Sequence, residues 1–160
     1  MSALLKDIYS PFFYEKFSDV AKDVIPSFNK NKFIDQIFDN DWEQRALKDR
    51  MKHTAFVLNG FLPKEFGKAI PLLEEMIRKI QKNMFTTSSL EFMYFPDYIE
   101  NYGIDHFETS VKSFEFVTQF TSCEFAVRPF IIKYGDSMIQ KMIQWSQHEN
   151  HHVRRLASEG

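Results

Sequence analysis

The sequence has 160 residues, a formal charge of −2 and one cysteine. This length suits a single domain whose core needs no disulfide, and an unpaired Cys123 is typical of a reducing cytosol. The apolar stretches are too short for a spanning helix, and charge near the N-terminus argues against a signal peptide, so we expect a cytoplasmic protein that does not enter a membrane. Eighteen phenylalanines against five glycines favour packed helices over a β-sandwich or barrel.

Helical periodicity dominates the first half of the chain. Ser10 and Pro11 predict a helix start, and an apolar stripe with three- and four-residue spacing then runs to Pro26. A short helix is expected over 31–40, and Asp41 is expected to cap a longer helix over 42–61. Pro63 opens a further helix that ends near residue 82. The inward positions of these four helices include Phe13, Phe17, Val20, Phe33, Ile37, Trp42, Met51, Leu58, Ile70, Leu73 and Ile77.

The second half continues the pattern after a polar stretch, 83–91, that predicts the longest loop. A helix is expected over 90–103, interrupted near Pro96 and closed by a left-handed cap at Gly103. Asp105 is expected to start the next helix. No run alternates as a strand would, so we expect eight or nine helices in an all-α fold, with HEAT-like repeats stacked into a curved α-solenoid.

The last helix has the shape of the second helix of a HEAT-type repeat. Asn150 predicts a side-chain cap, and Val153 and Ala157 lie four positions apart on the expected inward face. Val127 and Arg128 form a weaker echo of this pattern. Positive charge also leans toward this end of the chain, so a local basic face is compatible with the slightly negative total.

Two glutamates are candidate site residues. Glu124 follows Thr121 at the spacing of a capping box, which is the structural interpretation, whereas a carboxylate held in one direction also suits a functional site. Glu159 stands at the end of the last helix, where the helix dipole disfavours a negative charge. Residues that go against local helix preference are enriched at functional sites, although an exposed glutamate at a helix end lowers stability only slightly.

Three arginines, Arg128, Arg154 and Arg155, lie in the parts of the repeats that would line a concave surface. Their guanidinium groups match phosphate oxygens, and the alternative is ordinary solvated charge.

Metal and thiol chemistry find little support. His148 and His152 are four apart, but an Asn150 cap would separate them on two sides of a turn, so no metal site is expected. Cys123 precedes Glu124 at an expected helix start, which would lower the pKa of its thiol, yet no histidine in the motif serves as a base. Trp42 and Trp145 fall on apolar stripes and are expected in the core.

Four blocks carry a family resemblance: "WEQRALKDRM" (42–51), "YFPDYIENYG" (94–103), "TSCEFAVRPF" (121–130) and "MIQWSQHENHHVRRLASEG" (142–160). Together they resemble the AlkC branch of the DNA alkylation repair glycosylases, within the HEAT-like superfamily that also holds AlkD. The resemblance implies an enzyme that hydrolyses the N-glycosidic bond of alkylated bases such as 3-methyladenine in duplex DNA. Such chemistry on a cationic base needs no metal or organic cofactor, and no obligate protein partner is inferred.

Carried over by position, the family's two carboxylates near the lesion fall on Glu124 and Glu159. Cys123 departs from the serine more common there. The family pattern continues past Gly160 into further helices, so residues 1–160 are expected to be a single helical-repeat domain that forms the N-terminal part of a longer glycosylase domain. Inactivity of this chain alone is an open alternative. The competing hypotheses are a non-catalytic HEAT-repeat module that binds DNA or protein, and a purely structural helical fragment.

Overall fold

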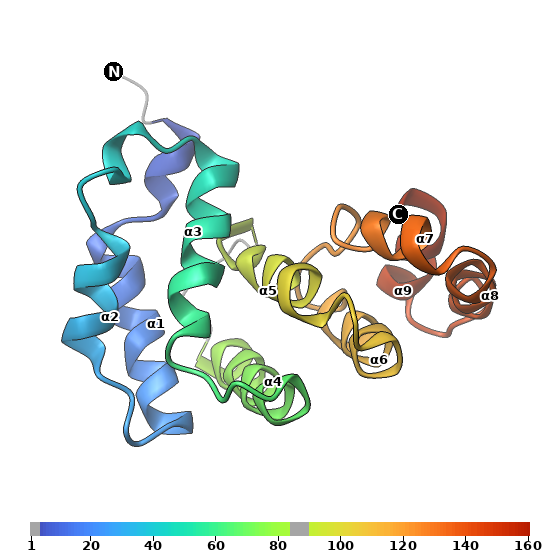
Figure 1. Ribbon diagram of the computed structural model, residues 1–160, viewed down its shortest axis with the longest axis horizontal. Coiled ribbons are helices and arrows are strands. Elements are labelled where there is room, and N and C mark those ends of the chain that lie inside the picture. The colour runs from blue at the N-terminus through green and yellow to red at the C-terminus, as the bar shows by residue number, and fades with distance from the viewer. Residues whose placement is uncertain (1–3, 84–89) are drawn as a thin grey trace.

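The computed structural model describes residues 4–83 and 90–160, and within these ranges the chain is helical with no strand (Figure 1). The expected all-α class is therefore confirmed. Most of the expected loop over 83–91 lies outside the described residues. The helices of the first half are η1 Leu5–Ile8, α1 Pro11–Val24, α2 Lys30–Ile37, η2 Trp42–Gln44, α3 Leu47–Asn59 and α4 Phe66–Asn83. Those of the second half are η3 Leu90–Phe92, α5 Tyr94–Gly103, α6 Phe107–Val117, α7 Arg128–Tyr134, α8 Asp136–Trp145 and α9 His151–Glu159.

The helices pack mainly on near neighbours in the chain. Helices α1, α2 and α3 lie side by side at one end of the molecule, and α7, α8 and α9 form the other end (Figure 1). Between them, α4 packs on α1 and α6, and α5 packs on both α3 and α6. This serial packing gives an elongated molecule with a hollow between α3 and α7. Trp42 and Trp145 are both buried, so their expected place in the core is confirmed.

Helix α1 begins as its sequence predicts. Ser10 Oγ accepts a hydrogen bond from the Phe13 backbone N–H at 3.1 Å, and Pro11 occupies the first helical position. Phe13, Phe17 and Val20 on the apolar face of α1 are then buried in the core.

The prediction of one helix over 42–61 is wrong for its first turns. Residues 42–44 form the short η2, Arg45 and Ala46 are extended, and α3 begins only at Leu47. The break is held by Arg50, whose buried guanidinium donates to the carbonyls of Lys6, Trp42 and Arg45. An uninterrupted helix would keep the Trp42 and Arg45 carbonyls within its own ladder and leave Arg50 without these acceptors.

Gly103 does not form the expected left-handed cap. It is the last residue of α5, and among the described glycines only Gly135, between α7 and α8, has a positive φ. Glycine is instead required at position 103 because there is no room for a side chain. An added Cβ would lie 2.3 Å from Ser110 Oγ and 2.5 Å from Phe66 Cζ. Asp105 does not cap α6 either, because His106 takes that position and Asp105 pairs with Lys133.

Within the described residues, no helix combines the length and the apolar character that a membrane crossing needs.

Candidate nucleic-acid interface

Glu124 lies in a turn between α6 and α7. No α-helix begins at Thr121, since α7 starts at Arg128 behind Val127, so the capping-box interpretation is wrong. The turn is closed by the Val127 N–H, which donates to the Cys123 carbonyl at 3.2 Å, and the Glu124 N–H lies 3.3 Å from Ser122 Oγ. The Glu124 carboxylate itself makes no hydrogen bond or ion pair with the described residues. It is therefore a half-buried charge that remains available to a ligand.

A polar hollow of about 170 Å³, here called the carboxylate hollow, contains Glu124. It lies between this turn and α9, which contributes His152, Arg155 and Leu156; the other lining residues are Thr118, Gln119, Phe120, Thr121 and Ser122. The fold thus brings Glu124 and Arg155 to one cavity.

Glu159 joins this group through Arg155. Arg155 Nε donates to Glu159 Oε2 at 3.0 Å, one helical turn later. The arginine offsets the unfavourable position of a carboxylate at a helix C-terminus, although both side chains are solvent-exposed and the pair is worth only a few tenths of a kcal/mol. Glu159 itself does not line the carboxylate hollow.

Arg154 and Arg128 lie elsewhere. Arg154 Nη1 donates to the carbonyls of His148 and Glu149, both at 2.8 Å, and its side chain lines a separate hollow with residues of α8. Arg128 stacks over the exposed Phe125 ring, with its guanidinium carbon 4.8 Å from the ring centre. Of the three predicted arginines, the structure brings only Arg155 to the two glutamates.

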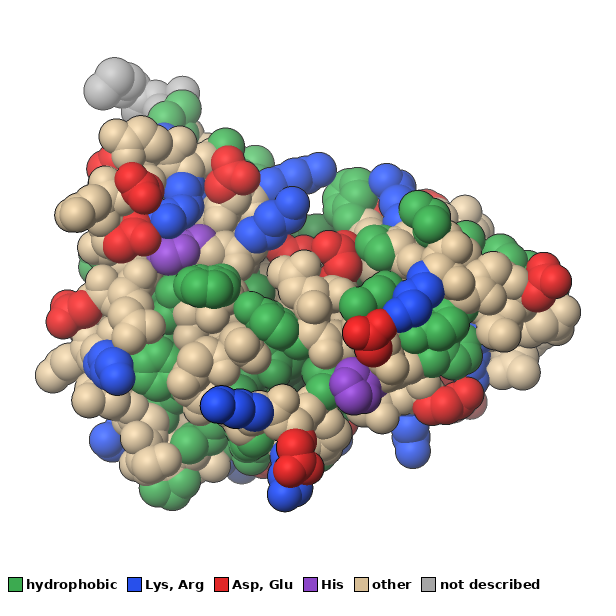
Figure 2. All heavy atoms as spheres, viewed as in Figure 1, with side chains coloured by type: hydrophobic (Ala, Val, Ile, Leu, Met, Phe, Trp, Pro, Cys, Tyr) green, Lys and Arg blue, Asp and Glu red, His purple; other side chains and the backbone are tan. Residues whose placement is uncertain are grey.

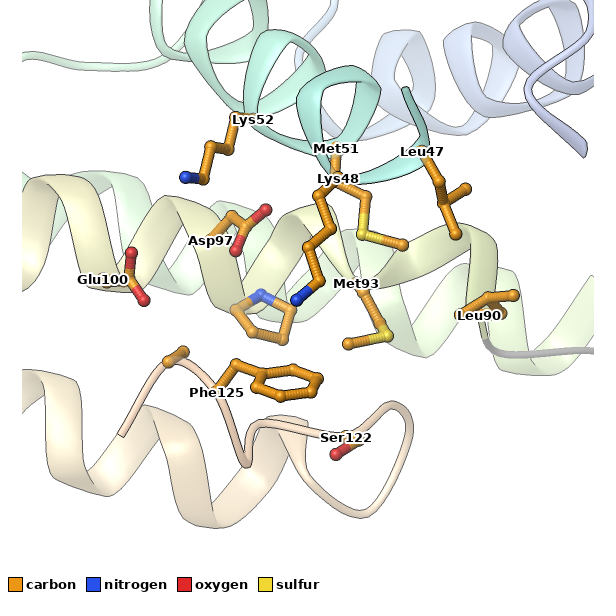
Figure 3. A pocket seen from close by; sticks show the side chains of 12 residues that line it. Leu47, Lys48, Met51, Lys52, Leu90, Met93, Asp97, Glu100, Ser122 and Phe125 are labelled. Atoms are coloured by element: carbon orange, nitrogen blue, oxygen red, sulfur yellow. The ribbon is translucent and has the colours of Figure 1, made fainter. Parts of the chain in front are cut away.

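A second cavity, here called the α3–α5 pocket, is lined by α3, by α5 and by the same turn (Figure 3). It has a volume of about 340 Å³ and a largely apolar lining. Charged side chains enter it from two helices, Lys48 and Lys52 from α3 and Asp97 and Glu100 from α5, and Phe125 closes it from the turn. The remaining lining residues are Leu47, Met51, Leu90, Met93, Pro96, Ser122 and Ala126.

Burial sets the electrostatics of this pocket. It raises the pKa of Asp97 to about 6, with the nearby Glu100 charge adding to the effect and Lys52 and Lys48 opposing it. Burial also raises the pKa of Glu100. The Asp97 carboxylate has no hydrogen-bond or ion-pair partner among the described residues, which distinguishes it from the exposed carboxylates that pair on the surface.

Sequence reasoning missed this second group. Asp97 stands in one of the blocks that carry the family resemblance, and Lys48 and Lys52 have the four-residue spacing that places both on one helix face. That spacing was the available signal, but the partner face comes from α5 and from the turn near Phe125, which only the fold brings close.

The thiol and histidine expectations have mixed outcomes. Cys123 is fully buried, and burial raises the pKa of its thiol, so the expected lowering at a helix start is wrong. The Asn150 cap is confirmed, since its Oδ1 accepts from the His152 N–H at 2.8 Å. Across residues 4–83 and 90–160, no cluster of three metal-ligating side chains occurs.

Comparison with known proteins gives similarities both in sequence and in structure. No protein-family model matches the sequence. The uncharacterized protein YhaZ of Bacillus subtilis (strain 168) is 38% identical over 156 residues, which are 98% of this chain and 42% of YhaZ. The Pseudomonas fluorescens alkylpurine DNA glycosylase AlkC, solved bound to DNA containing an abasic site analog, superposes on the whole chain with a TM-score of 0.90 and 27% identity.

This chain covers 43% of that AlkC structure, so it spans about two fifths of the length of both proteins. The resemblance to AlkC drawn from the sequence is confirmed by the superposition, and the helical fold is that of AlkC over all of the present chain.

Proposed function

We propose that this chain, similar throughout to AlkC, is a single helical-repeat domain of a DNA N-glycosylase that releases alkylated purines such as 3-methyladenine from duplex DNA. The main structural support is that Glu124 and Arg155 line one hollow while Glu159 pairs with the same arginine. A carboxylate beside an arginine suits a substrate that carries a cationic sugar centre next to a phosphate.

The proposed chemistry follows from the charge of the lesion. A 3-methylated purine nucleoside is cationic, so the C1′–N9 bond breaks with its electron pair passing to the base, which leaves without strong protonation. The rate then depends on the positive charge that develops on the deoxyribose. Glu124 is proposed to stabilise that charge and to accept a proton from the water that attacks C1′.

The arginines are proposed to position the DNA. Arg155, and with it Arg128 and Arg154, would contact backbone phosphates, which orient the duplex without reading its bases. Double-stranded DNA carrying an alkylated base is the proposed partner, and the AlkC structure similar to this chain contains DNA.

The test is release of 3-methyladenine from methylated duplex DNA, measured in single turnover for the wild type and for Glu124→Gln. Release by the wild type that falls about a hundredfold in the variant, with DNA binding retained, is the expected result. Wild-type rates in the variant would remove Glu124 from the mechanism. Binding to DNA without any release, both by this chain and by the full gene product, would instead support the non-catalytic module.

A further inference from the structure

Two cations stack on one exposed aromatic ring at the hollow between α3 and α7, and a third lies one helical turn away. Phe125 is 40% exposed, Lys48 Nζ lies 4.5 Å from the centre of its ring, and the Arg128 guanidinium carbon lies 4.8 Å from it. Lys52 follows Lys48 by one turn of α3 and lines the same pocket. We call Lys48, Lys52, Phe125 and Arg128 the cationic rim.

None of the three rim cations forms an ion pair with the described residues. Elsewhere the surface neutralises many of its cations: Arg155 pairs with Glu159, Arg45 with Asp39 and Lys133 with Asp105. The acidic side chains nearest the two lysines, Asp97 and Glu100, line the same pocket but form no ion pair with them (Figure 3). Figure 2 shows the same arrangement from outside, with Lys and Arg side chains on both margins of the hollow and acidic side chains between them.

Stacking on one ring brings two like charges from α3 and α7 close together. Each cation is attracted to the ring, but the cations repel one another, and an anion between them removes that repulsion. Phosphate is the anion that matches a guanidinium beside two ammonium groups. Because the cations are spread across an open hollow on flexible side chains, they fit an extended polyanion better than a free phosphate ion.

The turn between α6 and α7 connects the rim to the carboxylate hollow. Glu124 lines that hollow, its neighbour Phe125 carries the rim, and Ser122 lines both cavities. A DNA strand held at the rim would therefore lie beside the turn that carries Glu124.

We propose that Lys48 and Arg128, which stack on Phe125, and Lys52, one helical turn from Lys48, bind backbone phosphates of DNA across the hollow between α3 and α7. The rim adds two lysines, which the sequence patterns did not single out, to the phosphate contacts already proposed for Arg128 and Arg155. This proposal rests on the proposed function, because it takes duplex DNA as the ligand.

The test measures affinity for an undamaged duplex against salt concentration. The variants are Lys48→Met/Lys52→Met and Arg128→Met, and Lys16→Met is the matched control, because Lys16 also stacks on an exposed phenylalanine, Phe12, but lines neither cavity. The slope of log affinity against log salt should fall by about 0.9 for each phosphate contact removed, hence by about 1.8 in the double variant. The control should keep the wild-type slope.

The outcomes separate the two proposals. A wild type that binds DNA with a steep slope, together with rim variants that keep this slope, would overturn the rim and leave the proposed function standing. A wild type that binds no duplex DNA would overturn both. Free phosphate is the alternative ligand, and thermal unfolding with inorganic phosphate at constant ionic strength tests it. If phosphate stabilises the wild type but not the double variant, the rim binds free phosphate and its assignment to DNA is overturned.

Discussion

Arg155 donates to Glu159 at 3.0 Å and at the same time lines the hollow that contains Glu124. The two glutamates are therefore not equivalent. The charge of Glu159 is partly neutralised by its arginine, whereas the Glu124 carboxylate has no partner among the described residues. A developing sugar cation would be stabilised chiefly by the unpaired carboxylate, with Arg155 and Glu159 setting the charge around it.

Glu124→Gln tests the unpaired carboxylate. The variant keeps the size of the side chain and removes its charge, so excision should slow by about a hundredfold, or about 2.7 kcal/mol, while DNA affinity stays near the wild-type value. Stability should also stay unchanged, because Glu124 caps no α-helix. The exposed Glu149→Gln, which lines neither cavity, is the control for loss of one nearby charge. Single-turnover rates equal in both variants would refute the role of Glu124.

Glu159→Gln tests whether the second carboxylate serves the same charge. If it does, excision should slow, and the double variant with Glu124→Gln should lose less than the product of the two single losses, because residues that act on one transition state are not additive. Single-turnover excision by the two single variants and the double variant measures this coupling. Multiplicative losses would instead indicate that Glu159 acts independently, for example by holding Arg155.

The helical class and most helix positions follow from the sequence, because apolar residues at helical spacing must be buried whatever their partners are. The errors lie where a long-range contact decides local structure. Arg50 interrupts an otherwise regular helix by binding the Lys6 carbonyl, and Gly103 is selected by the closeness of Phe66 and Ser110. The candidate site was predicted in part for the same reason. The sequence pointed to Glu124 and Arg155, but not to the pocket that Asp97 and residues of α3 line together.

Gly103→Ala should destabilise the protein through steric overlap. The new methyl group would lie 2.3 Å from Ser110 Oγ, whose hydroxyl donates to the Gly103 carbonyl at 2.7 Å, so α5 and α6 would have to separate. We expect a loss of about 1–3 kcal/mol in the free energy of unfolding, measured in urea. Gly67→Ala is the control, since nothing lies within 4 Å of its added Cβ and alanine is the better helix former, so this variant should gain about 0.5–1 kcal/mol. Equal effects at both glycines would contradict the packing argument.

Phe125→Leu separates the ring of the cationic rim from its charges. Leucine preserves an apolar side chain but removes the aromatic face on which Lys48 and Arg128 stack. Affinity for duplex DNA should fall a few-fold, while the salt slope stays near the wild-type value because all three cations remain. Fluorescence anisotropy with a labelled duplex at several salt concentrations measures both quantities. A slope that falls as far as in the double lysine variant would mean that the ring itself determines the phosphate contacts.

Asp97→Asn should stabilise the protein in a pH-dependent manner. Burial raises the pKa of Asp97 to about 6 from an ordinary 3.8, so the folded state binds a proton more tightly than the unfolded state. The ionised carboxylate therefore destabilises the fold above pH 6, and this cost is relieved as the pH falls from about 6 to about 3.8, below which both states are protonated. Since one pKa unit corresponds to about 1.4 kcal/mol, the asparagine variant should be more stable than the wild type by about 1–3 kcal/mol at pH 8, with little difference at pH 4.

Urea unfolding at steps between pH 4 and pH 8 measures this pH dependence of stability. Asp35→Asn on the exposed face of α2 provides the control for loss of a surface charge. A difference that stays constant across this range, or a variant that is less stable at pH 8, would show that Asp97 carries no buried charge in the folded protein.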